Sequence, residues 1–304
     1  MRPATGREEI DRFNELPYVL NKEFERDMDE GRRRPEWMWM ALRGDQLVAR
    51  VAWWARNREA TEPLLMDVFD VADGEPLETG IELFRSASKH VLPNRPKPLD
   101  FLSFVPSDWR DDAEAKRGIE TRIKGLEQTG ARIFVERLRF AWAAGTAIRP
   151  PSGRLLFRSI EEGEELIGLM TRVLEGTLDA HSRRDLEERS AAQVARDQYH
   201  GDFLGDPKPR EWWRMATLAG KEPVGFVIPA RNAYNPIIAY IGVVPEHRGK
   251  GYIDDLLAEG TRIIDAHGGK RIRAATDVGN VPMAKAFARN GYRTDGAQIN
   301  MTWD

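Results

Sequence analysis

An apolar segment that ends in a basic turn with two glycines constrains the fold of this chain more than any other feature. Residues 237–244 are largely apolar, and the turn that follows at 245–251 reads Pro-Glu-His-Arg-Gly-Lys-Gly. Residues 252–266 then place apolar side chains at helical spacing. The pattern predicts a strand, a tight turn and a helix, in that order.

The turn also has the composition of an anion site. Gly249 and Gly251 carry no side chain where backbone amides would approach a ligand, and the N-terminus of the following helix attracts negative charge. Because Lys250 is followed by glycine, the turn does not match a P-loop. The sequence predicts a pyrophosphate cradle for a nucleotide-bearing cofactor, although an ordinary strand-to-helix connection has a similar composition.

Length and composition narrow the class of protein. A chain of 304 residues predicts about two domains. The absence of cysteine excludes a thiolate nucleophile, and the five histidines show no paired spacing, so we predict no metal site. With 46 basic and 49 acidic residues, the net charge of −3 gives no reason to expect nucleic acid as a partner.

The chain shows no sign of membrane insertion or export. No apolar run approaches the roughly 20 residues that a membrane helix needs, and the charged residues 1–11 lack the apolar region of a signal peptide. We expect a soluble cytoplasmic protein that does not bind membranes. The basic run 32–34 reads as a solvated loop.

The two halves of the sequence share an order of elements. The strands predicted at 39–42 and 47–53 form a hairpin, and so do those at 214–218 and 224–228. Residues 150–153 form a Pro- and Gly-containing linker near the midpoint. We predict tandem domains at 1–150 and 151–304.

The second half adds further elements. Helices are predicted at 160–178 and 185–203, a strand at 271–276, and a last helix capped by Asn280. The order predicts an α+β fold with α/β/α layers, in which helices flank both faces of a mixed, mostly antiparallel sheet.

Two spaced motifs carry a resemblance to the GCN5-related N-acetyltransferases, the GNAT superfamily. Arg248 and Gly251 stand at the first and fourth positions of the family's cofactor signature, whereas Ile253 replaces its final small residue. Downstream, Asn280, an aromatic residue and the pair 291–292 follow at the family's intervals. The resemblance covers roughly residues 212–303, and the tandem plan resembles that of the mycothiol synthases.

The resemblance implies acetyl-CoA as co-substrate. Its pyrophosphate would meet the backbone amides of 248–253, and its pantetheine arm would pair with the strand end and with Asn280, which could equally serve only as a helix cap. The side chains of the turn could add charge or point to solvent. The cofactor-binding residues implied are Val243, Val244, Arg248, Gly249, Lys250, Gly251, Tyr252, Ile253 and Asn280.

The catalytic residues are less evident. Direct transfer to an amine requires a base for the amine and an acid for the thiolate. Phe287 replaces the tyrosine acid of many relatives, which indicates core packing, and the strand at 237–244 carries no carboxylate. Asp277 is the nearest acidic candidate, with a turn role as its alternative, and Tyr240 is a candidate acid, with packing as its alternative.

The first half lacks a basic glycine turn at the corresponding place, because residues 66–76 are acidic. We therefore expect a degenerate domain without a cofactor motif at 1–150. The leading hypothesis is an N-acetyltransferase, acting as a monomer or homodimer, that acetylates a small-molecule amine. A non-catalytic acyl-CoA sensor and a nucleotide-binding protein of another class remain open, and so does the acceptor.

Overall fold

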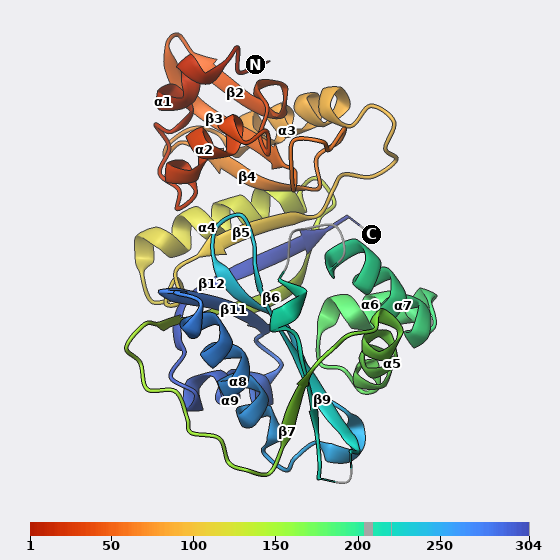
Figure 1. Ribbon diagram of the computed structural model, residues 1–304. Coiled ribbons are helices and arrows are strands. Elements are labelled where there is room, and N and C mark those ends of the chain that lie inside the picture. Colours follow the sequence, from red (N-terminus) through yellow and green to blue (C-terminus); the bar gives the residue numbers. More distant parts are fainter. Residues whose placement is uncertain (204–208, 220, 304) are drawn as a thin grey trace. The chain divides into compact units, whose positions relative to one another are not determined.

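The structure is a computed structural model that describes residues 1–203, 209–219 and 221–303 (Figure 1). It divides into two compact units, one formed by Met1–Glu136 with Gly296–Asp304 and the other by Arg137–Asp295. This division differs from the boundary between residues 150 and 151 suggested by the sequence. The reason is that each unit takes its last strand from the other half of the chain.

The first unit contains a mixed sheet. Its strand order is β1-β2-β3-β4-β5-β12, in which β4 and β5 are parallel and the other neighbours are antiparallel. The strands are β1 (Arg2–Pro3), β2 (Met38–Arg43), β3 (Gln46–Trp54), β4 (Leu65–Val71), β5 (Phe101–Val105) and β12 (Arg293–Thr302). The helices are α1 (Ile10–Phe13), α2 (Phe24–Asp29), α3 (Leu77–Val91) and α4 (Ala113–Glu127).

The second unit repeats this plan. Its strand order is β7-β8-β9-β10-β11-β6, with β10 and β11 parallel and the other neighbours antiparallel. The strands are β6 (Arg132–Ala143), β7 (Leu156–Ser159), β8 (Arg214–Thr217), β9 (Pro223–Arg231), β10 (Pro236–Val243) and β11 (Arg271–Asp277). The helices are α5 (Gly163–Leu174), α6 (Ala180–Glu188), α7 (Ala191–Gln198), α8 (Tyr252–Ala266) and α9 (Val281–Arg289).

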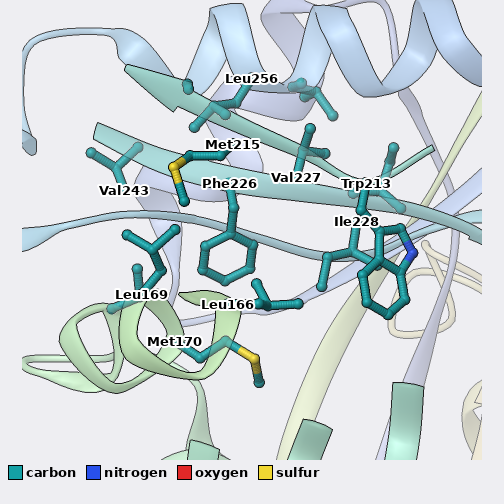
Figure 2. Close-up of a cluster of buried hydrophobic side chains, with 14 of the residues drawn as sticks. Leu166, Leu169, Met170, Trp213, Met215, Phe226, Val227, Ile228, Val243 and Leu256 are labelled. Carbon is teal, nitrogen blue, oxygen red and sulfur yellow. The ribbon is translucent and has the colours of Figure 1, made fainter. Parts of the chain in front are cut away.

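Helices cover both faces of the second sheet. In Figure 1, α8 and α9 lie on one side of this sheet and α5, α6 and α7 on the other. Figure 2 shows Leu256 of α8 above the strands and Leu166 and Met170 of α5 below them, with Phe226 of β9 directed towards α5. All four side chains are buried. The predicted α/β/α layers and tandem repeat are confirmed.

Two sequence predictions were wrong in detail. The helix expected at 185–203 is broken, because Arg189 and Ser190 adopt extended conformations between α6 and α7, and the Ser190 side chain caps α7. The run 32–34 is not a solvated loop. Arg33 is 2% exposed and donates two hydrogen bonds to Asp67, at 2.9 and 2.5 Å. Its partner lies far along the chain, where local composition gives no hint of it.

Within the described ranges, no helix combines the length and the apolar character required to cross a membrane.

Candidate cofactor and catalytic site

The two parallel strands of the second unit are in register only near their amino ends, as far as the described residues go. In the described part of this unit, Ile237 and Arg273 are the one registered pair between β10 and β11. A β-bulge follows between Ile238 and Tyr240, and residues 239–241 stay partly exposed although β10 is an interior strand. The carboxyl ends of parallel strands are a common place for ligands in sheet proteins. We refer to the stretch beyond this pair, where the described residues of β10 and β11 have no further registered pairing, as the gap between the two strands.

The predicted cradle lies directly after β10. Gly249 and Gly251 have φ values of 77° and 76°, which other residues rarely adopt, and Gly251 begins α8 without a side-chain cap. The backbone amides of residues 249–253 find no hydrogen-bond acceptor among the described residues. Five consecutive unsatisfied donors at a helix N-terminus form an anion site.

Arg248 holds this turn from behind. Its guanidinium donates to the carbonyl oxygens of Val243 at 3.1 Å, Glu175 at 2.7 Å and Val173 at 2.8 Å. Its backbone amide donates to Pro245 at 3.2 Å. Arg248 therefore connects the turn to β10 and α5, and the unsatisfied amides begin one residue after it.

Lys250 and Arg154 make further hydrogen bonds to the turn. The Lys250 ammonium donates to the Glu246 carbonyl at 2.9 Å. Arg154 donates to the Lys250 carbonyl at 3.0 Å, pairs with Asp255 at 2.6 Å and lies over the Tyr252 ring at 5.0 Å. The sequence pattern did not indicate Arg154, because it is distant from the motif along the chain.

Val243 and Val244 are buried where β10 meets the turn. The Val244 amide donates to the Val224 carbonyl at 3.0 Å, on the side of β9. The Val243 carbonyl accepts from Arg248 and keeps a second lone pair. Pairing of these two residues with a pantetheine arm stays a prediction.

Asn280 caps α9 by accepting a hydrogen bond from the Met283 amide at 3.3 Å. No acceptor for its side-chain NH₂ lies among the described residues, and the residue is only partly buried. The capping role and a role as donor to a ligand are therefore compatible, because they use different atoms of the side chain.

Asp277 lies at the carboxyl end of β11 and is 3% exposed. One carboxylate oxygen accepts from the Ala180 amide at 2.6 Å, and the other lies 2.9 Å from the Arg137 guanidinium. Burial raises the pKa of this carboxyl, and the nearby Asp179 adds to the rise. Asp277 thus has a raised proton affinity and also holds the first residue of α6.

His181 lies beside this carboxylate and escaped the sequence analysis. It is the second residue of α6, so the bond between Ala180 and Asp277 fixes its backbone near the end of β11. Burial lowers the pKa of its imidazole, while Asp179 opposes that change. The group therefore favours the neutral form, which can accept a proton.

Tyr240 lies in the middle of β10, directly after the β-bulge. Its ring lies 5.1 Å from that of Phe226 and 6.2 Å from that of Phe203. Burial raises the pKa of its hydroxyl, and Asp179 contributes to the shift. Within residues 1–203, 209–219 and 221–303 this hydroxyl has no hydrogen-bond partner, so it can serve a ligand.

Phe287 is confirmed as a core residue. It is 2% exposed, and its ring stacks on Phe140 at 4.8 Å. Tyr292 is also buried and shares a 2.7 Å hydrogen bond with Thr261. Phe287 has no ionisable proton, and the Tyr292 hydroxyl is engaged with Thr261. Neither residue is therefore a candidate for the acid.

Comparisons with known proteins agree with this geometry. The model of the acetyltransferase (GNAT) family matches residues 174–292, a segment that includes β10, the turn, α8, β11 and α9. This segment therefore belongs to the GNAT family, as its motifs predicted. No curated protein sequence gives a significant match.

Solved structures support the fold of the chain. A GCN5-related N-acetyltransferase from Sphaerobacter thermophilus is 14% identical, with a TM-score of 0.58 over 96% of this chain and 88% of that one. A tandem GNAT protein from the clavulanic acid biosynthesis pathway is 15% identical, with a TM-score of 0.54 over 99% and 97%. A GCN5-related N-acetyltransferase from Kribbella flavida is 12% identical, with a TM-score of 0.55 over 94% and 96%.

Proposed function

We propose that the chain is an N-acetyltransferase that moves an acetyl group from acetyl-CoA directly to an amine of a small-molecule acceptor. The single observation that carries the proposal is the run of unsatisfied amides at 249–253, which leads from the turn after β10 into the first residues of α8. A GNAT-type fold supports an acyl-CoA-dependent reaction in general. The site belongs to the predicted domain 151–304, and 1–150 is the degenerate partner.

The residues present fit the proposed ligand. The amides of 249–253 match the oxygens of a pyrophosphate, because a helix N-terminus combines free donors with a favourable dipole. The gap between β10 and β11 offers strand edges to the amides of the pantetheine arm, and the Asn280 NH₂ group adds a donor. Acetyl-CoA supplies the activated thioester when it is bound.

The transfer forms a C–N bond and breaks a C–S bond, so one proton must leave the amine and one must reach the sulfur. We propose Asp277 as the proton acceptor, because burial raises its pKa. We propose Tyr240 as the proton donor, because it follows the registered pair of β10 and β11 along β10 and its hydroxyl has no hydrogen-bond partner in the described ranges.

A sensor that binds acyl-CoA without turnover is the second candidate. Both Asp277 oxygens already contact protein groups, and Phe287 carries no proton and is enclosed in the core. These observations favour a site that binds the cofactor and leaves it unchanged.

The test is release of free thiol from acetyl-CoA in the presence of a panel of amines that includes aminoglycosides, polyamines and peptides. Acceptor-dependent thiol release supports the transferase. Stabilisation of the protein by CoA without thiol release from any acceptor supports the sensor. If CoA neither binds nor stabilises the protein, both versions are wrong.

A further inference from the structure

The first unit contains its own pair of separated parallel strands. Met66 and Phe101 are the registered pair of β4 and β5, just as Ile237 and Arg273 are for β10 and β11. In both units the parallel pair lies between an antiparallel hairpin and a strand from the other half of the chain. The first unit therefore repeats the strand arrangement that we assign to the cofactor in the second.

Arg122 of α4 joins the two strands of the first unit beyond their registered pair. Its guanidinium donates to the Phe69 carbonyl of β4 at 3.0 Å and to the Ser103 hydroxyl of β5 at 3.1 Å. It also pairs with the carboxylate of Asp70 on β4. Arg122 thus satisfies polar groups on both strands.

Tyr18, in the N-terminal segment, contacts both β5 and Arg122. The Phe104 amide of β5 donates to the Tyr18 hydroxyl at 2.9 Å, and the Arg122 guanidinium lies 4.9 Å from the centre of the Tyr18 ring. A cation over an aromatic face stabilises both partners. The two side chains therefore form one plug, with hydrogen bonds to both β4 and β5.

The second unit shows no such plug. In the described part of residues 137–295, we find no side chain that hydrogen-bonds to both β10 and β11. The turn after β4 also differs, because it carries a carboxylate, that of Glu75, which pairs with Arg43 and accepts a hydrogen bond from Thr79. The two gaps thus differ in occupancy as well as in sequence.

We propose that Tyr18 and Arg122 act as an internal substitute for the ligand in the first unit, so that the chain binds one molecule of CoA. The stoichiometry rests on the proposed function, whereas the plug itself does not. Its polar atoms take the places on β4 and β5 that an extended ligand with amide groups would otherwise fill. The buried Asp70 carboxylate holds both Arg122 and Arg50, so expulsion of the plug would take away one of its two cationic partners.

Residue-resolved amide exchange without CoA tests the plug. Tyr18→Phe keeps the ring and removes the acceptor of the Phe104 amide, so this amide should exchange roughly five- to tenfold faster than in the unchanged protein. Tyr292→Phe is the matched control, because it removes a buried hydroxyl from the second unit. Equal Phe104 exchange in the Tyr18→Phe variant and the unchanged protein would overturn the plug.

Calorimetric titration with CoA tests the stoichiometry. We expect one site per chain, and no site in a Gly251→Val variant. Two sites in the unchanged protein, or a site that survives Gly251→Val and protects residues 69–75 or 101–105 from exchange, would overturn the proposal. If the unchanged protein binds no CoA, the proposed function fails, and the exchange rate of Phe104 still decides the plug.

Discussion

The carboxylate of Asp277 accepts a 2.6 Å hydrogen bond from the backbone amide of Ala180. This bond joins the end of β11 to the first residue of α6. Asp277 therefore orients the helix that carries His181, and it does so from the strand end where we place the reacting groups. Its proposed role as a proton acceptor and its role in positioning α6 can be separated by substitution.

Asp277→Asn and Asp277→Ala should differ in stability. Asparagine keeps an oxygen for the Ala180 amide, whereas alanine leaves that amide and Arg137 without the acceptor. We expect Asp277→Ala to lower the free energy of unfolding by about 1–3 kcal/mol more than Asp277→Asn. Chemical denaturation of both variants measures this difference. Equal stability would show that the bond to Ala180 contributes little.

The same pair of variants tests the proposed base. If Asp277 accepts the amine proton, Asp277→Asn should bind CoA normally and lose most of the thiol release, by about 10²–10⁴-fold. If Asp277 only positions α6, Asp277→Asn should retain activity and Asp277→Ala should lose it.

Tyr240→Phe should separate activity from stability. The hydroxyl has no partner within the described residues, while its ring packs against Phe226. Removal of the hydroxyl should leave the melting temperature almost unchanged and lower kcat by about 10²–10⁴-fold if Tyr240 protonates the thiolate. Phe226→Leu serves as a packing control. An unchanged kcat in Tyr240→Phe would eliminate Tyr240 as the acid.

Arg154→Ala should weaken CoA binding although Arg154 is distant from the motif along the chain. It removes the donor that holds the Lys250 carbonyl and the partner of Asp255. The loss should amount to roughly three- to tenfold in Kd. Arg158→Ala, which removes an exposed pair with Glu165 on the same segment, is the control. Equal affinities for CoA in the two variants would show that Arg154 does not support the cofactor site.

His181 should make stability depend on pH. Burial lowers its pKa in the folded protein below the unfolded value of about 6.5. Between these two pKa values the unfolded chain binds more protons, so the free energy of unfolding should fall as the pH drops below about 6.5. His181→Gln should flatten this part of the curve. Denaturation at pH 5, 6 and 7 measures the effect, and identical slopes would contradict it.

The sequence predicted those parts of the site that lie within one local segment. The helix at 252–266 has the predicted bounds. The glycines of the turn could be recognised in the sequence because the positive φ values that they adopt are a local requirement. Phe287 was correctly placed in the core, because its helical spacing indicated the buried face.

Long-range partners could not be predicted in the same way. Arg154 contacts Lys250, and Arg137 contacts Asp277, across many residues of chain. The sequence also did not predict that β6 belongs mainly to the second unit and β12 mainly to the first. The two strands have similar sequence patterns, so the pattern alone cannot assign them. The charged groups at 32–34 looked solvated because Asp67 becomes their neighbour only after folding.

The affinity of the unchanged protein for CoA, compared with that of Gly251→Ala, tests the central claim most directly. Gly251 and Gly268 lie at opposite ends of α8, and both have a φ of 76°. Alanine at either position therefore introduces similar backbone strain, about 1–2 kcal/mol. We predict that calorimetry will show at least tenfold weaker CoA binding for Gly251→Ala and unchanged binding for Gly268→Ala. Equal CoA affinity in the two variants would contradict the assignment of residues 249–253 as the pyrophosphate site.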